Sequence, residues 1–167
     1  MLAMSLLGVV LIAMAGLVLA RQRAAGLAGG ELSSLHSRPS YHGLFTLLVV
    51  LIAGVVVHVA LRVLGNWYVG SALDGALTEL DPTIVGLQAE TVLADARALV
   101  AGGITSAEDA LRTELAKVFA SVDATRTWVV AIGTILAALA ATYWALSKIA
   151  VGFRARNRSE LIVRRIL

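Results

Sequence analysis

Two ionisable side chains lie within an otherwise apolar stretch of this chain. His58 and Arg62 fall inside residues 44–64, where the other residues are apolar or small. At a spacing of four they share one face of a helix, and ionisable residues inside a membrane span are candidates for proton or ion pathways. Arg62 precedes Trp67 and Tyr68, so its side chain can reach the polar interface. We interpret Arg62 as structural and the deeper His58 as a neutral residue that hydrogen-bonds between helices; a proton relay at His58 is the alternative.

The remaining residues offer no recognisable catalytic set. The other two histidines, His36 and His42, have no paired carboxylate nearby, and phosphate-loop, glycine-rich dinucleotide and zinc motifs are missing. The chain has no cysteine, which excludes disulfides, thiolate catalysis and cysteine metal sites. We therefore expect no enzymatic activity, no catalytic residue, no cofactor and no metal.

Three stretches are long and apolar enough to cross a membrane: Leu2–Ala20, Leu44–Leu64 and Trp128–Leu146. About 20 apolar residues in a helix span the ~30 Å hydrocarbon core of a bilayer. Hydrophobic residues make up 59% of the chain and charged residues 15%, and the mean hydropathy is +0.85. The sequence therefore predicts an all-α membrane protein, with three transmembrane helices, a small helical periplasmic cap and a C-terminal amphipathic helix. We therefore expect the lipid bilayer to be one of its partners.

The charges around the spans predict the orientation. Residues 21–43 hold three arginines against one glutamate, and the tail after residue 147 holds six basic residues against one glutamate. Residues 66–126 hold nine acidic residues against four basic ones. The positive-inside rule places the basic segments and the C-terminus in the cytoplasm, and the N-terminus and the acidic segment outside. This placement accounts for the pI of about 9.8, so we expect no nucleic-acid partner.

The chain divides into six segments on this basis. They are a transmembrane helix at residues 1–20, a basic cytoplasmic loop at 21–43, a second transmembrane helix at 44–65, a periplasmic helical segment at 66–126, a third transmembrane helix at 127–150 and a basic amphipathic cytoplasmic helix at 151–167. Arg21 and Arg23 follow the first apolar run and no basic residue precedes it, which argues against a cleaved signal peptide. In the loop, we expect Pro39 to break any helix coming from the first span, and Gly43 to free the backbone before the second.

The sequence of the periplasmic segment predicts two short helices. Asp81-Pro82 has the pattern of a helix start, with aspartate as the N-cap and proline at the first helical position. Gly102-Gly103 would end this helix, and a second would begin at Thr105 or Ser106 and continue unbroken into the third span. The predicted apolar stripes contain Ile84, Leu87, Val92, Leu93 and Ala96 in the first helix, and Leu111, Leu115, Val118, Phe119 and Val122 in the second.

The tail, residues 153–167, reads FRARNRSELIVRRIL and combines an apolar side with five arginines. This combination is typical of a helix that lies in the membrane interface and is attracted to anionic lipid. We predict an elbow helix along the inner leaflet; the alternative is an ordinary basic flank without a fixed orientation. Because natural proteins seldom end on such an apolar run, we also expect the chain to continue beyond Leu167.

Two short segments carry a family resemblance, LHSRPSYHG at Leu35–Gly43 and FRARNRSE at Phe153–Glu160. In these segments and in its layout, the chain resembles the N-terminal membrane extension of the bacterial phosphate ABC transporter permease, the C-subunit of the Pst system. The residues that carry the resemblance are Ser37, Arg38, Pro39, Ser40, Tyr41, His42, Gly43, Arg154, Arg156, Asn157 and Arg158.

The resemblance implies an accessory role in the import of inorganic phosphate across the bacterial inner membrane, in which the chain packs on or positions the permease core. The implied partners are that core, a second permease subunit, the ATPase subunits and the periplasmic phosphate-binding protein. The chain lacks the E-A-A signature of the core's coupling helix, so no translocation residue is transferred to it. Two other functions fit the residues alone: a sensory or regulatory membrane module, and a small free-standing membrane partner protein.

Overall fold

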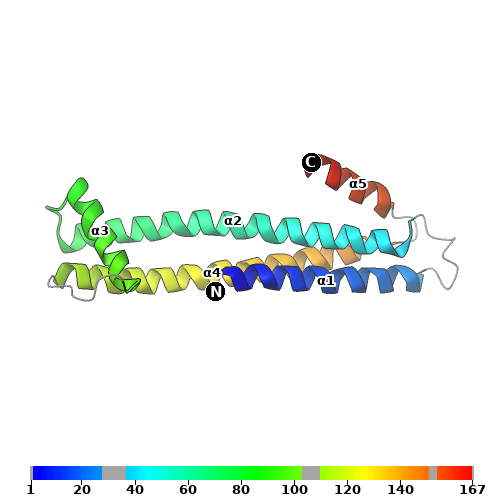
Figure 1. The fold of residues 1–167 in the computed structure, drawn as a ribbon, viewed down its shortest axis with the longest axis horizontal. Coiled ribbons are helices and arrows are strands. Elements are labelled where there is room, and N and C mark those ends of the chain that lie inside the picture. The colour runs from blue at the N-terminus through cyan, green and yellow to red at the C-terminus, as the bar shows by residue number, and fades with distance from the viewer. Residues whose placement is uncertain (1, 28–36, 103–109, 151–153, 167) are drawn as a thin grey trace. The chain divides into compact units, whose positions relative to one another are not determined.

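The computed structural model describes residues 2–27, 37–102, 110–150 and 154–166. These residues form helices and turns, and no β-strand occurs among them. The helices are α1 (Leu2–Leu27), α2 (Pro39–Leu80), α3 (Leu87–Val100), α4 (Ala110–Ser147) and α5 (Ala155–Ile166) (Figure 1). The predicted all-α fold is therefore confirmed.

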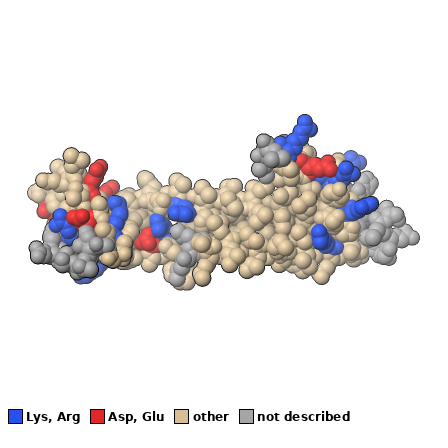
Figure 2. Space-filling model, in the orientation of Figure 1, with Lys and Arg blue, Asp and Glu red and all other residues tan. Residues whose placement is uncertain are grey.

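Helices α1, α2 and α4 each contain an 18-residue window apolar enough for a membrane span, with mean hydropathies of 2.5, 2.8 and 2.0. Figure 2 shows uncharged side chains over most of the surface of the long helices. Less than a third of each of these windows is buried inside the protein. Apolar surface of this extent is stable only against lipid or other membrane helices, so the chain is a membrane protein with three candidate spans.

The chain forms two compact units, residues 1–60 with 131–167 and residues 61–130, and α2 and α4 contribute to both. In the first unit, α1, α2 and α4 share a core of Val9, Ala13, Val50 and Ala138. The buried side of α1 carries mostly small residues, which leave room for α2 and α4 to approach; Gly16 is an example. A Cβ at Gly16 would lie 3.1 Å from the Thr46 methyl carbon and 3.3 Å from that of Thr142. Small residues let membrane helices approach closely, which supplies the contacts that lipid cannot.

The second unit has its own core, built from α2, α3 and α4. The buried residues Val69, Leu73 and Leu77 follow one another at helical spacing on α2, and Leu115 on α4 is fully buried with them. The predicted apolar stripes of the two later helices are largely confirmed, because their members pack against this cluster. Those members are Ile84, Val92, Leu93, Ala96, Leu111, Val118, Phe119 and Val122.

The predicted helix start at Asp81-Pro82 is wrong. Helix α2 continues to Leu80, and the Asp81 carboxylate then closes a local turn, in which Oδ1 accepts hydrogen bonds from the Thr83 backbone N–H at 3.0 Å and from the Thr83 hydroxyl at 2.6 Å. Helix α3 begins only at Leu87, after Gly86 with φ +62°. Leu87, predicted to face the core, is consequently 82% exposed.

The end of α3 agrees with the prediction. Gly102 follows the helix with φ +75°, a conformation that glycine adopts without strain. Gly103 and the predicted start of the next helix at Thr105 or Ser106 lie outside the described residues. From Ala110 onward α4 is a single helix into the third apolar stretch, as predicted.

The predicted role of Gly43 in freeing the backbone is wrong, because Gly43 lies inside α2. A Cβ at this position would come 2.9 Å from the backbone oxygen of Leu17 on α1. The glycine is therefore required for close approach of the two helices. Pro39 is the first residue of α2, a position that suits its fixed φ and missing N–H.

Candidate functional site

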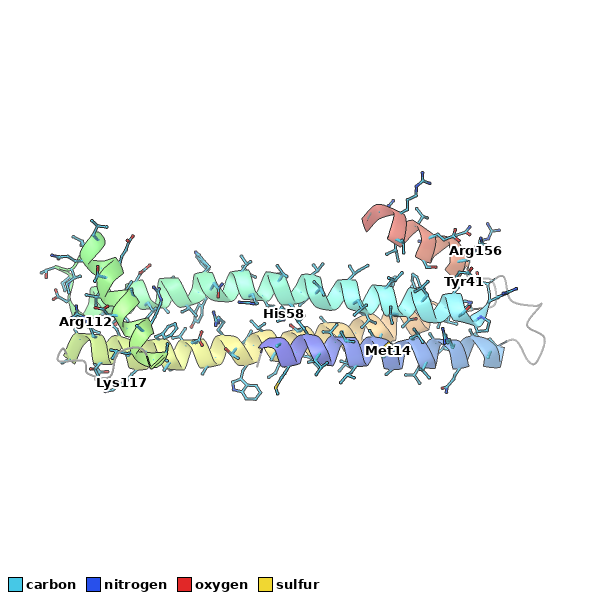
Figure 3. All side chains as sticks on the ribbon, viewed as in Figure 1. Met14, Tyr41, His58, Arg112, Lys117 and Arg156 are labelled. Atoms are coloured by element: carbon cyan, nitrogen blue, oxygen red, sulfur yellow. The ribbon has the colours of Figure 1, made fainter. Side chains whose placement is uncertain are left out.

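His58 on α2 is labelled in Figure 3, and its ring contacts hydroxyl groups from two other helices. Its Nδ1 atom is 3.2 Å from the Thr134 hydroxyl on α4 and 3.4 Å from the Ser5 hydroxyl on α1. All three side chains are at most 5% exposed. Helices α1, α2 and α4 thus each contribute one polar group to a hydrogen-bonded contact, which fixes the register of these three helices. Ser5 and Thr134 were not predicted, although hydroxyls within apolar helices are the residues to search for a histidine's partners.

Arg62 takes no part in this contact. It is exposed and belongs to the unit formed by residues 61–130. Although the i, i+4 spacing suggested that His58 and Arg62 share a helix face, the two residues do not form one site.

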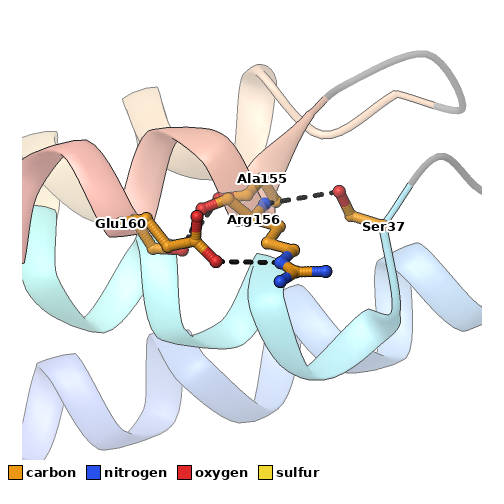
Figure 4. A network of polar contacts seen from close by, with 5 residues as sticks. Ser37, Ala155, Arg156 and Glu160 are labelled. Carbon is orange, nitrogen blue, oxygen red and sulfur yellow. Dashed lines mark hydrogen bonds and ion pairs between the residues drawn. The ribbon is translucent and has the colours of Figure 1, made fainter.

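The two motif segments meet in the first unit, although they lie far apart in the chain (Figure 4). The backbone N–H of Arg156 donates a hydrogen bond to the Ser37 hydroxyl at 3.3 Å, across 119 positions of sequence. Arg156 is in the first turn of α5, where backbone N–H groups have no partner within the helix. Ser37 therefore caps α5 from the other segment. We call the contacts of Ser37, Tyr41 and Arg156 the motif junction.

The Arg156 side chain strengthens the motif junction through its planar guanidinium. The group lies over the Tyr41 ring, with 5.9 Å between Cζ and the ring centroid, and its Nε donates to Glu160 Oε1 at 2.8 Å. The hydrogen bond and the charge of Glu160 raise the pKa of Arg156 above its usual value. Since both members of the ion pair are mostly exposed, the pair contributes orientation more than stability.

Small buried residues bring α5 close to the rest of the unit. Ala155 is fully buried and Ser159 is 1% exposed. The Ser159 hydroxyl donates to the backbone oxygens of Ala155 at 2.9 Å and Arg156 at 3.0 Å, so its burial leaves no polar group unsatisfied. A larger residue at either position would push α5 away.

Apart from the half-buried Pro39, the other motif residues divide into a buried and an exposed group. His42 and Gly43 are buried in the first unit, and the backbone oxygen of His42 accepts a hydrogen bond from the Thr46 hydroxyl at 3.1 Å. The exposed group lies outside the motif junction, and its members are Arg38, Ser40, Arg154, Asn157 and Arg158. His36 lies outside the described residues.

Comparison with known families gives a match over most of the chain. Residues 6–167 match the family model described as phosphate ATP-binding cassette transporter. The chain belongs to this family. The match extends over both motif segments and all five helices, so the resemblance inferred from the two segments is confirmed at the level of the family. No curated protein and no solved structure matches the chain.

Membership of the phosphate ATP-binding cassette transporter family, together with three candidate spans, associates the chain with a membrane complex that transports phosphate. Within this family, the structure adds that the motif junction joins the beginning of α2 to the beginning of α5.

Proposed function

We propose that the chain is the N-terminal accessory membrane region of a phosphate importer permease, and that it supports phosphate import by positioning the permease core. The observation that carries the proposal is the motif junction. It holds α5 against the beginning of α2 through a backbone hydrogen bond and a cation–aromatic contact. A core connected to, or packed against, α5 would thereby be held in a defined orientation to α1, α2 and α4.

The outer face of α1 offers a surface on which such a core could pack. Leu7, Leu11, Met14 and Val18 recur at spacings of four, three and four, and each is 48% to 63% exposed. In a bilayer this stripe contacts either lipid or another apolar helix. The partners in this proposal are the permease core, a second permease subunit, the ATPase subunits and the periplasmic phosphate-binding protein.

Phosphate uptake tests the proposal. The chain is studied in its natural context, in cells whose high-affinity phosphate import depends on the system that contains it. The double variant Ser37→Ala, Arg156→Ala removes the motif junction. Its matched control, Ser40→Ala with Arg154→Ala, changes the same residue types in the same two segments at exposed positions. We expect the initial rate of labelled-phosphate uptake to fall in the first variant and not in the control, at equal amounts of protein in the membrane.

Two outcomes would contradict the accessory role. If uptake is unchanged in the junction variant, the junction does not serve transport. If uptake capacity is unchanged while the cell's response to phosphate starvation is altered, the chain acts as a sensory module instead.

We further propose that the C-terminus is cytoplasmic and that residues 66–126 are periplasmic, on the inner membrane. The excess of acidic residues in that segment and of basic residues around α5 supports this orientation. Single cysteines at the exposed positions Ser121 and Ser40 test it in intact cells. We expect a membrane-impermeant thiol reagent to label Ser121→Cys and not Ser40→Cys; the reverse pattern would invert the topology.

A further inference from the structure

A groove of about 670 Å³ lies between α5 and the helices α2 and α4, within the first unit. Its size is in the range of about 300–1,000 Å³ that is usual for sites that bind small molecules. The walls are apolar: Phe45 and Val49 come from α2, and Leu161 and Ile162 from α5. Phe45 is 4% exposed, whereas Leu161 is 51% exposed. The groove therefore has a fixed floor and an uncovered apolar wall.

Basic side chains line the same groove. Arg158 and Arg165 flank the two apolar residues of α5 at positions i and i+7, so one face of this helix carries both kinds of side chain. Lys148, just after α4, is the third cation. In Figure 2, Lys and Arg side chains gather around α5 and the neighbouring helix ends.

These cations are not neutralised within the described part of the chain. Glu160, the one carboxylate on α5, pairs with Arg156 outside the groove, and no described carboxylate pairs with Lys148, Arg158 or Arg165. The Lys148 ammonium lies 5.6 Å from the centre of the Trp144 ring, which is 50% exposed and also lines the groove. Tryptophan is enriched where hydrocarbon meets lipid headgroups. The groove therefore combines three available positive charges with an apolar interior, beside a tryptophan of the kind found at the headgroup level.

We propose that this groove binds one anionic phospholipid, whose phosphate contacts Lys148, Arg158 and Arg165 and whose acyl chains lie against the apolar walls. Basic pockets between membrane helices are the sites at which anionic headgroups are bound. Free inorganic phosphate offers the same charge but would leave the walls of Phe45 and Ile162 facing water. A helix of another protein would cover the walls but would leave the three cations without counter-charges.

Quenching of Trp144 measures occupancy of the groove directly. The full chain with Trp67→Phe and Trp128→Phe retains Trp144 as its one tryptophan. It is reconstituted in neutral phosphatidylcholine that contains a small fraction of either brominated phosphatidylglycerol or brominated phosphatidylcholine. We expect stronger quenching by the anionic lipid, which gives a relative association constant greater than one. Equal quenching by the two lipids would overturn the proposal, and would also be the result if a protein helix is the natural occupant.

Charge variants on α5 separate a specific site from general attraction to a basic surface. The double variant Arg158→Gln, Arg165→Gln should lower the relative association constant by about fivefold for each arginine, because a basic residue near an anionic surface contributes on the order of 1 kcal/mol. The matched control Arg154→Gln, Arg164→Gln removes the same amount of charge, from the residue just before α5 and from its last turn, at positions that do not line the groove. It should retain most of the preference. An equal loss in both variants would show that there is no specific site.

Two further measurements test the part played by the apolar walls. Val49→Phe fills the half-buried wall without a change in charge and should reduce quenching, whereas Val56→Phe, at an exposed position of α2 outside the groove, should not. Inorganic phosphate, added against chloride at equal ionic strength, should not release the lipid. Release by phosphate would mean that the site binds free phosphate and not a lipid. No effect of Val49→Phe would mean that the apolar walls do not hold an acyl chain, and either result would overturn the proposal. Helicity by circular dichroism confirms that each variant is folded.

Discussion

Gly54 on α2 is packed against a side chain that cannot move aside. A Cβ at Gly54 would lie 2.5 Å from Cγ1 and 2.9 Å from Cγ2 of Val9 on α1. Val9 is fully buried, and a β-branched side chain in a helix has one strongly preferred rotamer. The substitution Gly54→Ala must therefore move α1 and α2 apart within their shared core.

The size of the effect follows from two opposing contributions. Overpacking a close-packed core costs about 1–3 kcal/mol, while alanine is favoured over glycine within a helix by about 1 kcal/mol. Gly70→Ala on the same helix receives only the second contribution, because nothing lies within 4 Å of the added Cβ. The difference in unfolding free energy between the two variants should thus be about 1–3 kcal/mol, with Gly54→Ala the less stable.

Forced unfolding of single molecules in bicelles measures these free energies without removing the chain from lipid. Val9→Ala removes both methyl carbons from the contact, so it should be less harmful in the Gly54→Ala background than in the wild type. Such non-additivity between Val9→Ala and Gly54→Ala would show that the loss of stability comes from the clash between these two side chains. If Gly54→Ala is as stable as Gly70→Ala, or if the two substitutions at the α1–α2 contact are additive, the close approach at Gly54 is refuted.

Two further predictions concern polar contacts. Thr134→Val should destabilise the chain by about 0.6 kcal/mol, the average for an interhelical hydrogen bond in a membrane. The destabilisation should be smaller in the His58→Leu background, where this bond is already lost, and an equal effect in both backgrounds would exclude the bond. The Thr83 hydroxyl and backbone N–H hold the pKa of Asp81 below its usual value. This contribution to stability is present above the unfolded pKa of about 3.9 and is lost as the pH falls through the lowered folded value. In Thr83→Ala the carboxyl carbon of Asp81 should titrate at higher pH by NMR, and an unchanged titration would contradict the turn.

The long helices could be predicted because their physical signals are local. A charge-free run of about 20 residues has few stable environments other than a bilayer, so the spans at Leu2–Ala20 and Trp128–Leu146 follow from composition alone. The absence of a helix breaker after Leu115 likewise indicates the unbroken α4. The buried residues Val69, Leu73 and Leu77 were not predicted. Their spacing of four residues is also a local signal of a buried helix face, so they could have been predicted.

The start of α3 and the partners of His58 depend on contacts that a local pattern does not determine. Asp81 can either cap a helix or close a turn with Thr83. Which of the two forms depends on how the residues after Asp81 pack against the core of the second unit. Hydrogen bonding of His58 to Ser5 and Thr134 requires the register of three helices. A sequence pattern can indicate that Asp81 and His58 are important, but it does not identify the residues that they contact in the folded chain.

The proposed function depends on the motif junction, and disulfide trapping tests this junction most directly. Because the chain contains no cysteine, a pair at Ser37→Cys and Arg156→Cys has no competing thiol in this chain. The Ser37 hydroxyl and the Arg156 backbone nitrogen are 3.3 Å apart, which places the two residues near the range that a disulfide can bridge. The control pair, Ser37→Cys with Arg164→Cys, places the second thiol about 12 Å farther along α5 by helical rise.

Oxidation is carried out in native membranes, and cross-linked and free chains are separated after proteolysis between the two sites. We expect rapid formation of the 37–156 disulfide and little formation of the 37–164 disulfide. Failure of the first pair to cross-link, or equal cross-linking of the two pairs, would show that α5 is not held at the beginning of α2.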